Sequence, residues 1–146
     1  MPQGFEADAL EYVAGYSVMN DLSARDIQLS VSQWTAGKAI DGFAPIGPGI
    51  ALAGEVGDPQ HLQLTTRLNG EVMQQASTSA MIFSVARLIS YISGLITLEP
   101  GDIIATGTPS GVGQSRTPPV YLKPGDVVDV EVECVGAIRN TVVAPD

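Results

Sequence analysis

A short polar segment near the start of the sequence holds the first residues that could do chemistry. The sequence NDLSARDIQ contains Asp21, Arg25 and Gln28, and its spacing places Arg25 and Gln28 on one face of a turn or short helix. Such a segment could present a carboxylate to a hard metal ion and a guanidinium to a substrate carboxylate. Spacing alone favours a simpler interpretation, a surface turn in which Arg25 pairs with Asp21 or Asp26.

A second candidate is Lys38, one of only two lysines, which lies in the sequence WTAGKAI. We expect it to be part-buried, and burial disfavours an ammonium group unless an anion or a catalytic role holds it there. The functional interpretation is an ammonium that stabilises an enolate or a carboxylate. The alternative is a side chain whose methylene groups cover Trp34. The residues themselves favour neither.

A glycine-rich loop, TGTPSGVG at 106–113, follows an expected strand at 102–105. Its glycines match neither the dinucleotide fingerprint nor the P-loop pattern, and no helical pattern follows, so nucleotide binding is disfavoured. A small carboxylate is a better fit. The backbone amides around Gly107 and the hydroxyl groups of Thr106 and Thr108 could hold it.

The single histidine and the single cysteine exclude several other kinds of site. His61 is expected at the surface, and neither Cys134 nor any serine lies in a nucleophile-elbow context, so Ser-His or Cys-His catalysis is not expected. The pair cannot supply the usual nitrogen and sulfur ligands of zinc. Any metal is therefore expected to be oxygen-bound, as Mg²⁺, Mn²⁺ or Ca²⁺ are.

Composition restricts the partners and the compartment. Seven basic against sixteen acidic residues give a formal net charge of −9 over 146 residues, which disfavours nucleic acid and anionic membranes as partners. The length and the 45% hydrophobic content fit one globular domain with a core. With one cysteine, no secretory signal pattern and no apolar run of about eighteen residues, we expect a cytoplasmic protein.

The expected elements are mostly strands. Residues 14–21 predict a buried strand that ends at the polar segment, and Ser23 is expected to cap the turn or short helix after it. The glycine-rich and proline-rich stretch at 37–53 predicts strands joined by tight turns. Residues 62–68 alternate in polarity up to Asn69-Gly70, the pattern of a β-hairpin.

One principal helix is expected at about 84–93, because its apolar residues recur with helical spacing between a Ser84 cap and a Gly94 stop. A shorter helix is expected at 7–13. The sequences LEPGD at 98–102 and LKPGD at 122–126 each predict a turn that leads into a strand. No regular βαβ alternation is present, so the predicted fold class is a mixed, β-rich α+β roll or sandwich.

Three segments in this order closely resemble the fumarylacetoacetate hydrolase (FAH) family, and the C-terminal strands match it as well. The resemblance covers about residues 7–143. It implies a β-sandwich roll, usually dimeric, that binds Mg²⁺ or a similar ion through carboxylates. Members of the family hydrolyse, decarboxylate or isomerise 2-oxo acids such as acylpyruvates and hydroxymuconate derivatives. The segments are YVAGYSVMNDLSARDIQ, QWTAGKAIDGFAPIGP and MIFSVARLISYISGLITLEPGDIIATGTPSGVG.

The resemblance also implies a role for each candidate. Asp21 matches the metal-binding aspartate, and Arg25 and Gln28 match the substrate or metal-shell residues that follow it. Lys38 matches the active-site lysine, and Thr108 the threonine that meets the substrate carboxylate. The implied chemistry is C–C hydrolysis or keto-enol isomerisation of a 2-oxo acid, through an enolate held by the metal ion and Lys38.

The departures from the family pattern lead to further expectations. Family enzymes carry two more metal-binding glutamates in a Glu-x-Glu strand some thirty residues before the aspartate, and a lid with a His-Glu pair. Only twenty residues precede Asp21, and Glu6 and Glu11 have the wrong spacing for that pair. We therefore expect a single FAH-like catalytic domain over 1–146, truncated on its N-terminal side, with weakly bound Mg²⁺.

Three hypotheses follow. The chain is an enzyme half that needs the missing strand, a degenerate non-catalytic partner that keeps the fold, or an unrelated domain that binds small acids. The density of family motifs favours the first two. Apolar surface left uncovered by absent strands leads us to expect a homodimer or a higher oligomer.

Overall fold

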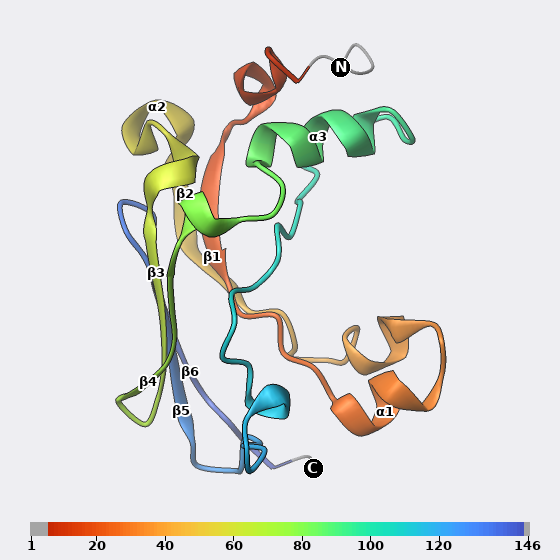
Figure 1. Ribbon diagram of the computed structural model, residues 1–146, viewed down its shortest axis with the longest axis vertical. Helices are drawn as coiled ribbons and strands as arrows, with labels where there is room; N and C mark the ends of the chain where they lie inside the picture. The colour runs from red at the N-terminus through yellow and green to blue at the C-terminus, as the bar shows by residue number, and fades with distance from the viewer. Residues whose placement is uncertain (1–5, 145–146) are drawn as a thin grey trace.

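Two antiparallel sheets make up most of the protein (Figure 1). The computed structural model describes residues 6–144. The smaller sheet pairs β1 (Gly15–Met19) with β2 (Ile46–Leu52), and the larger has the order β4-β3-β5-β6. The expected mixed, β-rich architecture is confirmed. The larger sheet contains β3 (Gln63–Leu68), β4 (Glu71–Ser77), β5 (Val127–Val132) and β6 (Gly136–Thr141).

Helices are short and lie outside the sheets. The α-helices are α1 (Arg25–Ser30), α2 (Ala53–Val56) and α3 (Val85–Ser93). Single 3₁₀ turns connect the other segments, and the first of them replaces the longer helix expected at 7–13. They are η1 (Ala9–Tyr12), η2 (Trp34–Gly37), η3 (Pro59–His61), η4 (Thr78–Ala80) and η5 (Gly113–Ser115).

The β3–β4 hairpin forms where the sequence predicts it. Asn69 and Gly70 have φ angles of 51° and 87°, and a two-residue turn of this type requires positive φ at both positions. The side chain of Asn69 also reaches the next strand. Its Nδ2 donates to Asp126 Oδ1 at 2.8 Å, and its Oδ1 accepts from the backbone N–H of Val127 at 2.8 Å. The hairpin is thereby tied to the start of β5.

Two small apolar clusters form the core. One packs α3 against η1, and the other packs β1 against the inner face of β5. Val18 on β1 is 1% exposed and lies at the centre of the second cluster. The buried members are Ala9, Val85 and Ile89 in the first cluster, and Val18, Val128 and Val130 in the second.

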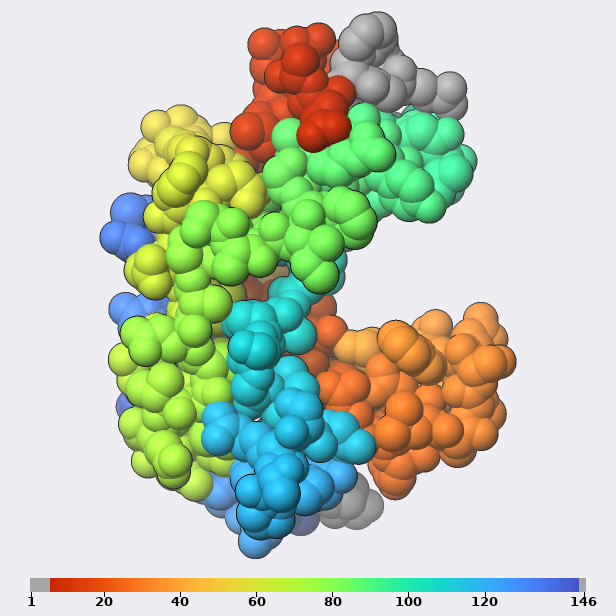
Figure 2. Space-filling view, in the orientation of Figure 1, coloured from red at the N-terminus to blue at the C-terminus, as the bar shows by residue number. Residues whose placement is uncertain are grey.

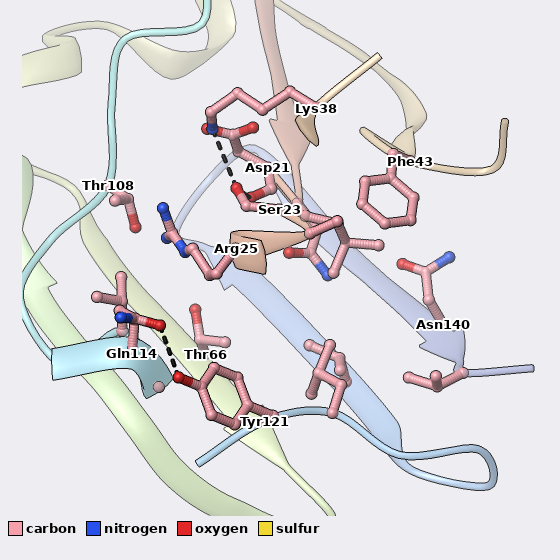
Figure 3. Close-up of a pocket in the computed structure, with 18 of the residues that line it drawn as sticks. Asp21, Ser23, Arg25, Lys38, Phe43, Thr66, Thr108, Gln114, Tyr121 and Asn140 are labelled. Atoms are coloured by element: carbon pink, nitrogen blue, oxygen red, sulfur yellow. Dashed lines mark hydrogen bonds and ion pairs between the residues drawn. The ribbon is translucent and has the colours of Figure 1, made fainter. Parts of the chain in front are cut away.

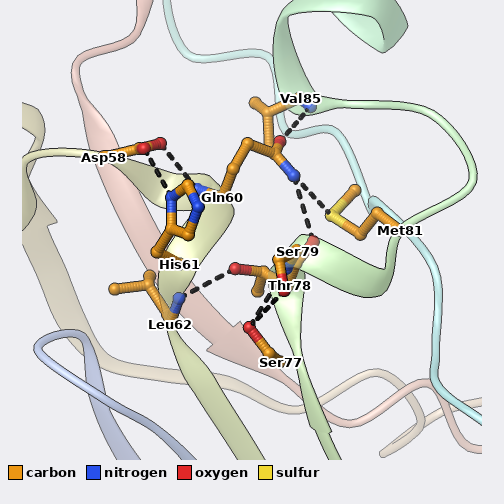
Figure 4. A network of polar contacts seen from close by, with 9 residues as sticks. All are labelled: Asp58, Gln60, His61, Leu62, Ser77, Thr78, Ser79, Met81 and Val85. Atoms are coloured by element: carbon orange, nitrogen blue, oxygen red, sulfur yellow. Dashed lines mark hydrogen bonds and ion pairs between the residues drawn. The ribbon is translucent and has the colours of Figure 1, made fainter.

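Helix α3 confirms the predicted principal helix. Ser84 is its N-cap, and Ser84 Oγ accepts from the backbone N–H of Arg87 at 3.1 Å. The helix is held to the preceding turns by Gln60 (Figure 4). Gln60 Oε1 accepts from the N–H of Val85 at 2.6 Å, and Nε2 donates to the carbonyl of Thr78 at 3.0 Å. His61 lies beside this network with a 73% exposed side chain, as expected.

Two local predictions were wrong. Residues 102–105 form no strand: Ile103 is 71% exposed, and the segment runs past the sheet in extended coil (Figure 1). A strand needs a neighbouring backbone to pair with, and β5, after the second Pro-Gly-Asp turn, has β3 and β6 on its two sides. The N-cap of α1 is Ala24 rather than Ser23, because Ser23 Oγ faces Lys38 instead.

The other strand predictions hold in part. The strand expected at 14–21 spans Gly15–Met19 and is mostly half-buried, with only Val18 fully buried. The stretch 37–53 supplies one strand, β2, rather than several. Residues 38–45 connect η2 to β2 without regular structure, which leaves them free to border the cleft described below.

The surface is large for the mass of the chain. Its accessible area is 9548 Å² for 15.2 kDa, roughly a third more than the ~7100 Å² of a compact monomer of that mass. Among residues 6–144, twenty large apolar side chains are exposed, whereas eight apolar residues are buried. Much apolar surface therefore remains uncovered. Between residues 6 and 144, no helix is both long enough and apolar enough to cross a membrane.

The hydrogen bond between the side chains of Asn69 and Asp126 predicts that the stability of the protein depends on pH. Hydrogen bonds from the Asn69 side chain and the Lys123 N–H lower the pKa of Asp126 below its ordinary value of 3.8. The unfolded chain binds this proton more readily, so the stabilisation is present above about pH 4 and is lost as the pH falls further. Asp126→Asn should lower the Tm at pH 7, and the difference from wild type should close towards about pH 3.

Circular dichroism melts between pH 3 and pH 7 would measure this difference. Glu71→Gln is the matched control, since it removes an exposed carboxylate from the same hairpin. A Tm difference for Asp126→Asn that stays constant with pH would contradict the prediction.

Candidate functional site

An open cleft of about 1330 Å³ contains most of the residues singled out from the sequence. It is bordered by α1 and η2, by the loop that leads to η5, and by the inner face of the larger sheet. Figure 2 shows the segment with α1 and η2 standing out from the rest of the molecule, with the surface hollowed beside it. Figure 3 shows Asp21, Arg25, Lys38 and Thr108 around one space.

The projecting segment depends on the contact between Gly37 and α1. A Cβ atom placed on Gly37 would lie 2.5 Å from Cβ of Gln28 and 2.7 Å from its Cα and N atoms. Only glycine allows η2 to come so close to the helix. The carbonyl of Gly37 also accepts from the N–H of Ala24 at 2.9 Å. This packing brings Lys38, the next residue, back towards the end of β1.

Lys38 pairs with Asp21. Lys38 Nζ lies 2.5 Å from Asp21 Oδ2 and donates to Ser23 Oγ at 3.2 Å. The Lys38 side chain is 33% exposed and that of Asp21 is 44% exposed, so water screens the ion pair. The simpler interpretation, a turn in which Arg25 pairs with Asp21 or Asp26, was wrong, since the partner of Asp21 is Lys38. The expected part-burial of Lys38 is confirmed.

Arg25 is oriented by Gln28. Arg25 Nη1 donates to Gln28 Oε1 at 2.6 Å, and Gln28 is only 2% exposed. The guanidinium group has five N–H donors in a planar fork, of which this contact uses one. The confirmed feature is that Arg25 and Gln28 share a face of α1. Gln28 is therefore a buried side chain that holds the guanidinium end of Arg25 in place by one hydrogen bond.

The glycine-rich loop is fastened to β4 by Gln74. Gln74 Nε2 lies 2.9 Å from Thr108 Oγ1 and 2.8 Å from the carbonyl oxygen of Pro109. Gly107 and Thr108 line the cleft, but Thr106 is not among the lining residues. The loop therefore presents the hydroxyl of Thr108, rather than that of Thr106, to the space near Arg25.

A second set of hydrogen bonds holds the glycine-rich loop to the hairpin at a β-bulge in β4. Pairing between β3 and β4 shifts register after Thr66, which leaves Met73 as the extra residue of a β-bulge. Arg116 uses this bulge, because its Nη2 donates to the carbonyl of Met73 at 2.5 Å and its Nε donates to the carbonyl of Gly111 at 3.1 Å. The loop is thus held at both of its ends.

Sequence reasoning missed the residues that hold the loop. Gln74 and Arg116 are 34 and 5 positions from the groups they contact in the loop. Tyr121, whose hydroxyl donates to Gln114 Oε1 at 2.8 Å at the border of the cleft, was missed as well. Two weak signals were present. Arg116 is one of only seven basic residues, and Gln74 alternates towards the inner face of a predicted hairpin.

The donors present fit only part of a metal site. Between residues 6 and 144, no group of three His, Cys, Asp or Glu side chains is arranged to hold a metal ion. Mg²⁺ prefers about six oxygen ligands, and Asp21 offers one carboxylate of the right chemistry. One of its oxygens already pairs with Lys38. Further ligands for an ion at Asp21 would have to include water, hydroxyl or backbone oxygens, or groups outside the described range.

The contact at Gly37 predicts the stability of the projecting segment. Gly37→Ala should destabilise the protein by about 1–3 kcal/mol, because the added methyl group collides with the backbone of α1. Urea unfolding would measure the change. Gly54→Ala, in exposed α2 with open space around the position, is the matched control and should be neutral or more stable by about 0.5–1 kcal/mol. Equal midpoints for wild type and Gly37→Ala would contradict this role.

The fold and the cleft together define a β-rich domain whose cleft is bordered by Arg25 and Lys38, and comparison with known proteins gives its family. Residues 3–143 match the family model described as fumarylacetoacetate (FAA) hydrolase, C-terminal. The chain belongs to the fumarylacetoacetate hydrolase family.

A curated relative and two solved structures illustrate the similarity. The chain is 49% identical to the mitochondrial oxaloacetate tautomerase FAHD2A of Bos taurus, over 93% of this chain and 44% of the relative. It superimposes on a fumarylacetoacetate hydrolase from Exiguobacterium antarcticum with a TM-score of 0.93 and 46% identity, covering 97% of this chain and 50% of the other. The FAH-like fold is therefore confirmed.

The second structure is a fumarylpyruvate hydrolase from Pseudomonas aeruginosa in complex with Mn²⁺ and pyruvate. Its TM-score is 0.88 at 34% identity, with coverage of 97% of this chain and 59% of that protein. A divalent metal is thus supported for the family. The chain spans about half the length of the curated relatives it matches. Since the tautomerase of Bos taurus is mitochondrial, the cytoplasmic location stays a prediction.

Proposed function

We propose that this chain forms the ligand-binding part of an enzyme that acts on small 2-oxo acids, with keto-enol tautomerisation of oxaloacetate as its reaction. The observation that carries the proposal is the cleft, where the ammonium of Lys38, the guanidinium of Arg25 and the hydroxyl of Thr108 border one space. In a protein with a net charge of −9, such a gathering of donors is suited to an anionic ligand. The similarity to oxaloacetate tautomerase supports this choice of reaction.

Each side chain has a part in the proposed reaction. The guanidinium of Arg25, held in place by Gln28, binds a carboxylate of the substrate. The hydroxyl of Thr108 donates to a second carboxylate oxygen. The ammonium of Lys38 stabilises negative charge on the 2-oxo oxygen as the enolate develops. Tautomerisation moves one proton from C3 of oxaloacetate to that oxygen, so the products balance without any other reactant.

We further propose that Asp21 is a ligand of a divalent cation. Mg²⁺, Mn²⁺ and Ca²⁺ all accept carboxylate oxygen, and the fumarylpyruvate hydrolase with Mn²⁺ supports an ion of this kind. When bound, such an ion supplies Lewis-acid polarisation of the 2-oxo group. Lys38 lies 2.5 Å from the oxygen concerned. An ion on that oxygen would release the ammonium towards the ligand.

Asp21→Ala should abolish the effect of divalent ions, because it removes the one carboxylate beside Lys38. Calorimetric titration with Mn²⁺, with and without oxalate as an enolate mimic, would measure the loss. The rate of oxaloacetate tautomerisation, followed by ultraviolet absorbance, should fall by about 10²-fold or more. Asp8→Ala, which removes an exposed carboxylate with no side-chain cap bond, is the charge-matched control. An unchanged ion response in Asp21→Ala would rule out the assignment.

A non-catalytic family partner is the second candidate. The lack of a group of three metal-ligating side chains among residues 6–144 favours it, because Mg²⁺ with few protein ligands is bound weakly. The two candidates differ in the titration above. A functional site gives saturable binding that oxalate strengthens, whereas a degenerate partner binds neither ion nor oxalate.

We also propose that the chain associates with a second copy of itself. The exposed apolar side chains and the excess of surface over a compact monomer support this. Sedimentation velocity at micromolar concentration should show dimers or larger species. A monomer over the whole concentration range would contradict the proposal.

A further inference from the structure

Gln74 occupies a position from which it can control the hydrogen-bonding direction of Thr108. It lies on β4 opposite Thr66, on the face of the sheet that borders the cleft. Its amide nitrogen is 2.9 Å from Thr108 Oγ1 and 2.8 Å from the carbonyl oxygen of Pro109. One amide group therefore meets two acceptor oxygens of the loop.

The chemistry of these partners fixes the orientation of the amide. A backbone carbonyl can only accept, so the group facing Pro109 must be the NH₂ end of Gln74. The NH₂ end has two hydrogens, and the second points to Thr108 Oγ1. The amide oxygen cannot replace it there without turning the NH₂ group away from Pro109. Thr108 Oγ1 is thus the acceptor in its contact with Gln74.

This polarity decides what Thr108 offers to a ligand. A hydroxyl group has one donor hydrogen and two lone pairs. Because Gln74 uses a lone pair, the hydrogen of Thr108 remains available as a donor. Figure 3 shows the hydroxyl of Thr108 directed towards the space that it shares with Arg25. A donor in that direction is suited to a carboxylate or enolate oxygen.

We propose that Gln74 is a positioning residue that holds Thr108 as a hydrogen-bond donor for the carboxylate of a 2-oxo acid. The inference rests on the function proposed above and adds a residue to it. Gln74 acts through Thr108 and through the loop backbone at Pro109. It favours an anionic ligand, because it leaves the hydroxyl hydrogen of Thr108 free to donate.

Two substitutions test whether the amide of Gln74 controls the direction in which the Thr108 hydroxyl donates. Gln74→Glu keeps the shape but supplies only acceptors, so Thr108 would donate to the new carboxylate and turn its lone pairs to the cleft. Gln74→Met removes both hydrogen bonds and leaves the hydroxyl free to rotate. Affinity for an anionic ligand should therefore fall in the order Gln, Met, Glu. Because the added charge of Glu also repels an anion, the double-mutant cycle below, rather than this order, separates an action through Thr108 from support of the loop.

The experiment is calorimetric titration of the 146-residue chain with oxalate in the presence of Mn²⁺. Gln74→Met should bind oxalate about three- to tenfold more weakly than wild type, and Gln74→Glu about thirtyfold or more. The matched control is Gln75→Glu, which adds the same charge at the next residue, on the exposed side of the strand. Its affinity should stay within about twofold of wild type.

A double-mutant cycle with Thr108→Val completes the test, because it removes the hydroxyl through which Gln74 is proposed to act. In that background Gln74→Met should weaken oxalate binding less than it does in the wild type, because only the hydrogen bond to Pro109 is left to lose. This arm stands even where Gln74→Glu does not fold. Equal binding by wild type and Gln74→Met, or the same loss in both backgrounds, overturns the role of Gln74 and leaves the proposed function intact. Absence of oxalate binding by the wild type overturns the proposed function itself.

Discussion

The candidate site depends on one steric constraint, the close packing of Gly37 on the backbone of Gln28. With no side chain at position 37, η2 lies directly against α1, and the chain turns back so that Lys38 reaches Asp21. Gln28 is buried by the same contact and holds the guanidinium of Arg25. A small residue and a buried amide therefore place two cationic groups on one cleft. No long-range charge attraction is needed to explain their positions.

Electrostatics explains why that arrangement matters in this particular chain. Acidic residues outnumber basic ones by sixteen to seven, so a small anion approaches a surface that repels it on average. Arg25 and Lys38 lie on one cleft, and hydroxyl groups add neutral donors beside them. Specific donors at short range can outweigh a net charge spread over the whole surface, because salt and water screen the distant charges.

The parts of the fold that could be predicted from the sequence are those fixed by local interactions. The Asn69-Gly70 turn and the helix at 84–93 depend on backbone preferences and on caps within a few residues. The strand expected at 102–105 has the same local signal as β5, but no neighbouring strand in the described part of the chain pairs with it. The candidate site shows the same division. The shared face of Arg25 and Gln28 was predictable from their spacing, whereas the contacts of Gln74 and Arg116 cross the fold and needed the structure.

The bulge at Met73 links parts of the molecule that would otherwise move independently. Its carbonyl is turned out of the β-ladder and is bound by Arg116, while Gln74, the next residue, holds the other end of the same loop. The hairpin, in turn, is tied to β5 through Asn69. One network of hydrogen bonds therefore connects the hairpin, the loop and β5. A ligand bound against the loop is joined through this network to a turn that it never touches, so the order of that turn is expected to depend on the occupancy of the cleft.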